Sequence, residues 1–439
     1  MTDRRRKSSA SIRRRGAALL AAAAILSLPG TALPIAGDPA GPIGLDGSFR
    51  AIPLYLDNED VPALFGADDT ERRLTNTLRL VLSGRPRRNV AYEIHGLLNV
   101  ERRSDGGGLF DQTAAVIAGG AGRHRGMDLT YYTDRDEEWT GDLSADRLLL
   151  RISRGRADLT VGRQAVTYGK AWFWNPLDVF APFDPRRFDR DYKSGVDAAR
   201  LDMALGLTSG VTVVGAAGEK DGEGSDDFWN GSNYGSSLLG RVFTTVLGFD
   251  VAAQGGKVYG GYQWGGAASG EIGPLEARAE CAWFDARDPD PLPWPLEGDE
   301  LEDRATWVAG VGRWFESGLD LQLEYLDQGL ADPDDRNASL ARVAAGHAFH
   351  MSRRLLGGLA SYDILPIVTG SVAGLVSLDD GSFQVQPGVR WSTGDDSEFV
   401  LGGIVNFGDE PRGNTVDPGI RSEFGTYPHV LYMEFKIYF

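Results

Sequence analysis

The chain has 439 residues, with 45 Lys and Arg against 62 Asp and Glu, and a formal net charge of −17. This acidic balance excludes nucleic acid as a partner, because phosphate binding needs a basic face. The 58 glycines, 19 Phe, 14 Tyr and 10 Trp favour short strands, tight turns and aromatic membrane girdles. A single cysteine excludes a disulfide framework, and a mean hydropathy of −0.24 excludes a bundle of apolar membrane helices.

The N-terminus has the order of a secretory signal peptide. A basic segment ending at Arg15 precedes an apolar stretch from Gly16 to Leu28, and Gly30 and Ala32 suit the cleavage positions. We therefore expect residues 1–32 to be a signal peptide and the protein to be exported by the secretory pathway. Cleavage there would leave 38 basic and 61 acidic residues, a balance of −23.

The dominant pattern of the remaining chain is alternation of apolar and polar residues in segments of about ten residues, the length of a tilted membrane strand. Leu275, Ala277 and Ala279 alternate with charged residues, and Leu321 and Leu323 alternate with Asp320, Gln322 and Glu324. Charges at every second position are typical of a wide barrel with a water-filled lumen. The expected lumen-facing candidates are Glu93, His95, Glu276, Arg278, Glu280, Asp320, Glu324 and Arg390.

This pattern predicts an all-β, antiparallel, up-and-down transmembrane barrel with short periplasmic turns and long extracellular loops. Eighteen strands are expected, in the ranges 48–54, 74–83, 89–100, 146–153, 157–165, 197–207, 210–217, 238–247, 249–259, 261–270, 274–284, 305–315, 318–327, 353–363, 370–378, 382–392, 397–407 and 427–439. The count must be even if both termini lie in the periplasm, which requires Ser339–Met351 to be loop or loop helix. Sixteen strands is the alternative.

The domain organisation follows from this count. Residues 1–32 would be the signal peptide, 33–47 a short periplasmic segment, and 48–439 the barrel, with a loop at 166–196 that folds inward. The stretch from Leu355 to Leu378 is largely apolar, but Pro366 divides it into two strand-length pieces. We therefore expect two strands there rather than a membrane helix.

The final strand has one apolar face that ends on the terminal aromatic residue. Phe435, Ile437 and Phe439 lie on this face, opposite Glu434 and Lys436. Such a strand is typical of the signal that the barrel assembly machinery reads, and it predicts the outer membrane, with its lipid and lipopolysaccharide, as the location. The alternative is the edge strand of a soluble sheet, which would invite aggregation if exposed.

The region 162–202 is the candidate constriction of the pore. A loop of this length is unusual for a simple connection, and its aromatic residues would be costly to leave in water. Folded inward, it would place basic and acidic side chains across the lumen, where they could select solutes. The candidates are Arg163, Gln164, Asn175, Asp178, Arg186, Arg187, Lys193, Asp197 and Arg200. The same charges could instead pair with one another and hold the loop against the wall, and both roles remain open.

Three short motifs occur in this region: Gly162-Arg163-Gln164, Asn175-Pro176-Leu177-Asp178 and Lys193-Ser194-Gly195-Val196-Asp197. They resemble a broad family of proteobacterial porin-like outer-membrane proteins, with alginate-export-type channels as more distant relatives. The close match covers about 40 residues, and the rest of the chain agrees in strand and turn pattern. The resemblance implies a channel and names no substrate.

The sequence contains no recognisable catalytic set, haem motif or phosphate-binding glycine loop. His347 and His350 could share a face of a short helix, but without a third ligand no metal site is expected. We therefore expect no cofactor and no enzyme activity. The leading hypothesis is a porin or selective channel for passive diffusion of small hydrophilic solutes. The alternatives are a barrel-borne enzyme and a structural or secretion barrel, and a homotrimer is possible for a porin.

Overall fold

The computed structural model describes residues 36–37, 41–58, 69–104, 124–132, 138–180, 192–218, 236–258, 261–286, 303–344, 348–413 and 419–439. Eighteen long strands form the wall: β2 (Gly44–Asp57), β3 (Thr70–Arg87), β4 (Val90–Arg103), β6 (Trp139–Arg154), β7 (Ala157–Gln164), β8 (Val196–Ala204), β9 (Gly210–Ala216), β10 (Ser237–Val246), β11 (Phe249–Val258), β12 (Gly261–Ile272), β13 (Leu275–Ala286), β14 (Arg304–Trp314), β15 (Leu319–Gln328), β16 (Arg354–Leu365), β17 (Val368–Ser377), β18 (Phe383–Gly394), β19 (Ser397–Phe407) and β20 (His429–Tyr438).

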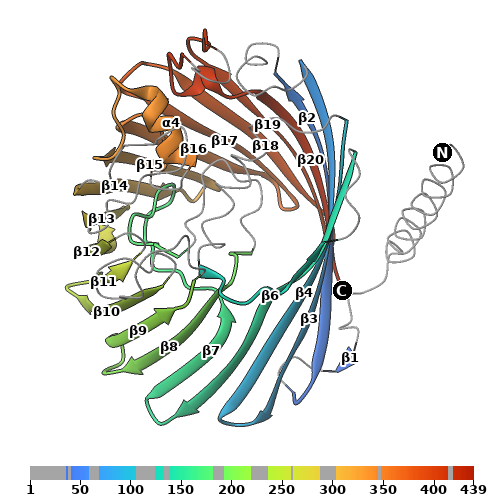
Figure 1. The fold of residues 1–439 in the computed structure, drawn as a ribbon, viewed down its shortest axis with the longest axis vertical. Helices are drawn as coiled ribbons and strands as arrows, with labels where there is room; N and C mark the ends of the chain where they lie inside the picture. Colours follow the sequence, from blue (N-terminus) through green and yellow to red (C-terminus); the bar gives the residue numbers. More distant parts are fainter. Residues whose placement is uncertain are drawn as a thin grey trace, which may run out of the picture.

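Each wall strand pairs antiparallel with its neighbours in sequence, and β2 pairs with β20, so the sheet closes on itself (Figure 1). The predicted antiparallel barrel of 18 strands is therefore confirmed, and the alternative of 16 is wrong. The apolar stretch around Pro366 forms β16 and β17 as expected. In the region 339–351, the described residues 339–344 and 348–351 form no strand, and α4 (Arg336–Ala344) occupies the first part. No helix among the described residues is long and apolar enough to cross a membrane.

Two short strands add to this wall. β1 (Ala36–Gly37) pairs with the start of β2, which begins at Gly44 rather than at the expected residue 48. β5 (Thr130–Tyr132) pairs with β6 beyond the point where the shorter β7 ends. The segment 124–132 therefore continues the wall beyond the end of β7.

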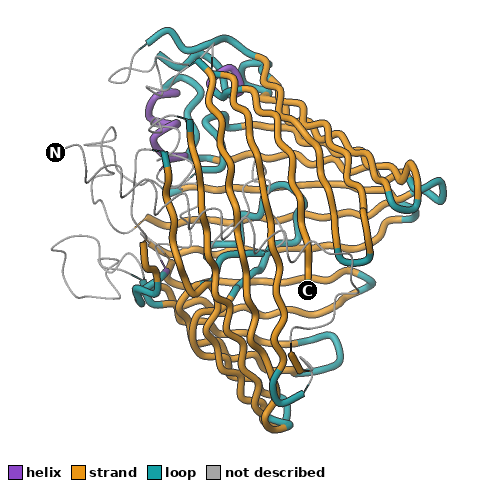
Figure 2. Tube along the Cα trace, turned by 90° about the vertical axis from the view of Figure 1, so that its right-hand side faces the viewer, coloured by secondary structure: helices purple, strands orange, loops and turns teal. Residues whose placement is uncertain are grey.

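The connections differ between the two ends of the barrel (Figure 2). One end has tight turns such as Gly155-Arg156 and Leu247-Gly248, and we call it the short-turn end. The other, long-loop end carries α4, the short helix η3 (Phe424–Thr426) and the longer connections. The hairpin 378–382 is the short exception at the long-loop end, where its Asp380 contacts Arg336 of α4.

The outer surface of the wall is apolar. Alternate residues of the strands point outward. Among them, Leu150, Val161, Val242, Leu323 and Leu401 are 40–52% exposed. So large an exposed apolar surface is unfavourable in water and is typical of a surface that faces lipid. The opposite side of the same strands carries the polar residues.

Candidate functional site

The first half of the connection between β7 and β8, residues 165–180, lies inside the barrel, and we call it the pore loop. Three groups of its side chains are buried against the inner wall. Val166, Tyr168 and Phe180 pack in one apolar cluster with Val196, Ala198, Val214, Ala216, Leu239, Val258 and Phe284. Phe173 and Trp174 pack in a second cluster with Val308, Leu326, Val343, Met351, Leu355, Leu375, Phe424 and Tyr427. Leu177 packs with Ala267 and Ala282. Burial of these side chains explains why the aromatic loop is stable inside a water-filled barrel.

A glycine on the wall makes room for the second cluster. At Gly357 of β16, a Cβ atom would lie 2.9 Å from the indole of Trp174 and 3.0 Å from the ring of Phe173. Since β16 presents no side chain there, the two aromatic rings approach the backbone of the wall directly. Trp174 is completely buried as a result.

Two wall carboxylates hold the pore loop by its backbone. Glu280 of β13 accepts hydrogen bonds from the backbone N–H groups of Lys170 and Ala171, the latter at 2.8 Å. Glu324 of β15 accepts them from Trp172 and Phe173, the latter at 2.7 Å. An irregular loop inside a protein must find acceptors for its N–H groups. These two side chains are 2% and 1% exposed, so neither faces free solvent.

Two wall amides complete the backbone contacts. Gln254 of β11 donates to the carbonyl oxygen of Leu177 at 2.8 Å, and Gln263 of β12 donates to that of Pro176 at 3.0 Å. Asn175 begins the turn that contains Pro176 and Leu177, and its carbonyl oxygen accepts the N–H of Asp178. The two glutamines could not be singled out from the sequence, because nothing local distinguishes them from other polar wall residues.

The far end of the loop is held by a buried ion pair. The ammonium of Lys193 contacts the Asp178 carboxylate and donates to the carbonyl oxygen of Val166 at 2.5 Å. The two side chains are 6% and 2% exposed. Burial lowers the pKa of the Lys193 ammonium from its ordinary value, and the charge of Asp178 opposes this shift. The Asn-Pro-x-Asp and Lys-x-Gly-x-Asp motifs thus meet at one contact.

A second buried ion pair joins the C-terminal end of β7 to the segment 124–132. Arg163 donates to both carboxylate oxygens of Asp197, at 2.8 and 3.0 Å. The same guanidinium donates to the carbonyl oxygens of Ala145 and Met127, and Asp197 accepts the N–H of Met127 at 2.8 Å. Arg163 is 1% exposed. Nearby, the Gln164 amide donates to the carbonyl oxygens of Thr160 and Ala198 at 3.1 and 3.0 Å.

A third charge centre surrounds Asp146, which the sequence did not single out. A register shift in the pairing of β4 with β6 leaves Asp146 without a partner opposite it. Its carboxylate accepts hydrogen bonds from Arg79, Arg125 and Arg147 at 3.1–3.2 Å. Arg147 also donates to the carbonyl oxygen of Lys193, which connects this centre to the pore loop. A bulge of this kind is decided by pairing, so alternation in one strand cannot reveal it.

The remaining candidates lie in the lumen with more exposure. Glu93 is paired with His95 at 2.7 Å and its side chain is 40% exposed. Arg200 is paired with Asp202 at 2.7 Å, with side-chain exposures of 23% and 34%. Glu276 is 58% exposed near the short-turn end, beside the largely buried Arg278.

Asp320 also lies near the short-turn end, where it accepts a hydrogen bond from Gln322 at 2.8 Å. Arg186 and Arg187 lie outside the described residues.

A ladder of charges lines the wall where the barrel closes. Arg50 of β2 contacts Glu434 of β20 at 2.7 Å, and Lys436 lies 3.4–3.5 Å from both Glu434 and Glu398 of β19. Arg390 of β18 lies 3.5 Å from Glu398 and is 62% exposed. Their neighbours Phe435 and Ile437 point to the opposite, outer face, because side chains alternate along a strand. The backbone of Phe439 pairs with Gly47 in both directions, at 2.7 and 2.9 Å.

His350 contacts Trp174 on one side and Glu423 on the other, and all three are buried, which the sequence did not predict. His347, the other member of the His-x-x-His pair, lies outside the described residues. Among the residues that are described, no three His, Cys, Asp or Glu side chains come together as metal ligands.

No protein-family profile matches the chain, and no curated protein matches it either. Solved structures do match its fold. OprD from Pseudomonas aeruginosa aligns with a TM-score of 0.53 at 8% identity, over 92% of this chain and 97% of that one. OccK8 (OprE) from the same organism gives 0.53 at 9% identity, over 90% and 98%. OccAB4 from Acinetobacter baumannii gives 0.52 at 8% identity, over 91% and 99%. The chain therefore has the closed barrel fold of these outer-membrane proteins over nearly its whole length.

Proposed function

We propose that the protein is an outer-membrane channel for passive diffusion of small hydrophilic solutes. The observation that carries the proposal is the contrast between the two faces of one closed wall. The outer face is apolar, whereas charged side chains on the inner face remain exposed, 62% for Arg390 and 40% for Glu93. Exposed charges inside a barrel require water inside it. The likeness of fold to OprD and OccK8 supports the same function.

We propose further that the solute path follows one half of the wall. The pore loop packs on β8–β17, where its anchors are buried. The inner faces of β2–β6 and β18–β20 carry the charge ladder, the Glu93–His95 pair and the Asp146 centre. Solutes that pass would meet this second half and, on the first half, the side chains that the pore loop leaves uncovered, Arg200, Glu276 and Asp320.

The candidate residues then divide into two groups. We assign loop bracing to the buried group, which consists of Arg163, Gln164, Asn175, Asp178, Lys193, Asp197, Glu280 and Glu324. We assign solute contact to the more exposed group, which consists of Glu93, Arg200, Glu276, Asp320 and Arg390. His95 is only 6% exposed and holds Glu93 in place. Arg278 belongs with the bracing group because it supports Glu324 at 3.7 Å.

The route to the membrane completes the proposal. Residues 1–32 would direct secretory export and be removed, and the segment between residue 33 and the start of β2 at Gly44 would lie in the periplasm. The strand ending in Phe435, Ile437 and Phe439 would recruit the barrel assembly machinery. The long-loop end would then face outward, beside lipopolysaccharide. The same proposal includes assembly as a homotrimer, a porin-like ancestry marked by the three motifs, and a lack of enzyme activity.

Planar-bilayer recording of the refolded barrel tests the function. We expect stable, discrete conductance steps and liposome swelling with small neutral sugars. Folding is checked by the shift in gel mobility between unheated and boiled samples. A folded, inserted barrel that never conducts would overturn the channel. It would leave the structural or secretion barrel and the barrel-borne enzyme as the alternatives to pursue.

A further inference from the structure

Three buried side chains form a line from the pore loop to the long-loop end. The indole N–H of Trp174 donates to Nε2 of His350 at 3.0 Å, and Nδ1 of His350 lies 3.0 Å from a carboxylate oxygen of Glu423. Trp174, His350 and Glu423 are each 0% exposed. They come from three different connections, which follow β7, β15 and β19. The line therefore joins the pore loop to two loops at the barrel's mouth.

Only one protonation state of His350 satisfies this line. The Trp174 indole can only donate a hydrogen bond, so Nε2 must carry a lone pair. Nδ1 then carries the proton and donates it to Glu423. A doubly protonated imidazole would point a second N–H at the indole N–H, and two donors cannot form a hydrogen bond. The ionised histidine therefore cannot hold Trp174.

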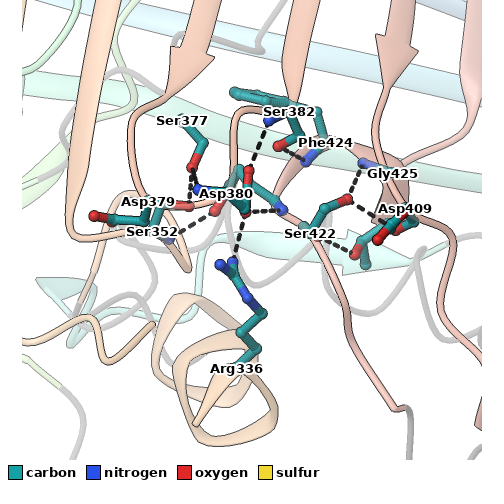
Figure 3. A network of polar contacts seen from close by, with 12 residues as sticks. Arg336, Ser352, Ser377, Asp379, Asp380, Ser382, Asp409, Ser422, Phe424 and Gly425 are labelled. Carbon is teal, nitrogen blue, oxygen red and sulfur yellow. Dashed lines mark hydrogen bonds and ion pairs between the residues drawn. The ribbon is translucent and has the colours of Figure 1, made fainter. Parts of the chain in front are cut away.

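The groups that surround His350 come from every element packed against it. Glu423 is held by the backbone N–H of Ser352 at 2.7 Å, and its own N–H donates to Asp380 at 2.9 Å. Asp380 belongs to the hairpin 378–382 and pairs with Arg336 of α4 at 2.8 Å (Figure 3). From β15, Gln328 donates to the carbonyl oxygen of His350, and η3 contributes the ring of Phe424.

The groups around His350 differ in whether their charge changes in mild acid. Burial raises the pKa of Asp380, but hydrogen bonds from Ser382 and Glu423 outweigh it and hold that pKa below its ordinary value. Asp380 therefore keeps its charge in mild acid. On the pore-loop side, the carboxylate of Glu324 is bound by the backbone N–H groups of Trp172 and Phe173. Histidine is the side chain whose charge ordinarily changes in mild acid.

We propose that His350 is a positioning residue that holds the pore loop through Trp174 only while it is neutral. Protonation strengthens the contact with Glu423 and breaks the contact with Trp174. The indole N–H is then buried without an acceptor, which favours displacement of Trp174 from its seat beside Gly357. The middle of the pore loop becomes free to enter the lumen, and the channel closes more often in acid.

The first test rests on the proposed channel function. It records single-channel currents of the wild type and two variants at about pH 7.5 and about pH 5. In the wild type, loss of one buried hydrogen bond should raise the frequency of closures about tenfold in acid. In His350→Gln, the amide can accept from Trp174 and donate to Glu423 at either pH, so closures should stay rare. In Trp174→Phe the conflicting donor is gone, so the closure frequency should not depend on pH.

A second readout is independent of conduction. Selective ¹⁵N labelling of the indoles gives one resonance for each of the 10 Trp residues, and the resonance missing in Trp174→Phe belongs to Trp174. In the wild type this resonance should shift or broaden in acid, and in His350→Gln it should not. The other described histidines, His95, His124 and His429, are unchanged in both variants.

The outcomes separate the two proposals. A barrel that fails to conduct but shows the His350-dependent shift keeps this inference and overturns the channel. Equal acid-induced closures in the wild type and in His350→Gln would overturn the inference, as would an unchanged Trp174 resonance. Gel mobility of the unheated variants verifies that each barrel is folded.

Discussion

The two halves of the barrel interior use their charges in opposite ways. On the half that carries the pore loop, Glu280 and Glu324 are almost fully buried and bind backbone N–H groups. On the half that closes the barrel, Arg390 is largely exposed and meets Glu398 only at 3.5 Å. The same alternating strand pattern places both the buried and the exposed charges on the inner face of the wall. Whether an inward charge braces the loop or faces water depends on whether the loop covers it.

The largest expected effect is on the braced half, at the Arg163–Asp197 pair. Asp197→Ala leaves the guanidinium of Arg163 buried without its counter-charge, and breaking a buried pair from one side costs about 3–5 kcal/mol. The denaturant midpoint of the refolded barrel should fall accordingly. The double variant Arg163→Met with Asp197→Leu should recover most of the loss, because no charge is left buried. An equal fall of the denaturant midpoint in both variants would show that packing, rather than charge, makes the Arg163–Asp197 contact stabilising.

A smaller effect is expected from the wall carboxylates. Glu324→Gln replaces charge-assisted acceptance of two backbone N–H groups with a neutral amide, a loss of about 1–3 kcal/mol at one anchor. The barrel should still fold, and the single-channel current should become noisier as the loop moves. The matched control is Glu276→Gln, since Glu276 is 58% exposed and binds no loop backbone. Equal noise in the two variants would argue against a bracing role for Glu324.

The smallest effect on stability, with a clear effect on selectivity, is expected on the exposed half. Arg390→Glu changes a side chain that is 62% exposed, and exposed ion pairs contribute about 0–1 kcal/mol. The denaturant midpoint should hardly move, whereas the reversal potential in a salt gradient should shift toward cations. Arg353→Glu is the control, because Arg353 is also paired and 53% exposed but lies at the long-loop end of the other half. An equal shift in both variants would place selectivity at the mouth instead.

Much of the fold could be read from the sequence because its signals are local. Side chains alternate with a period of two, so the sequence of Leu319–Gln328 predicts both that it is a strand and which of its residues face the lumen. The even count of strands then excluded a strand at Ser339–Met351, and α4 occupies the first part of that range. Inward placement of Glu280 and Glu324 also followed from alternation.

The roles of those inward residues were decided by tertiary structure alone. The N–H groups bound by Glu280 and Glu324 lie more than 100 residues away in sequence, and His350 meets Trp174 across 176 positions. No periodicity connects such partners, and the His-x-x-His spacing suggested a different chemistry for His350. The sequence determined which face of the wall is polar, because each residue's direction depends on its own strand. The tertiary structure decided which of those polar groups are buried, because burial depends on where the pore loop packs.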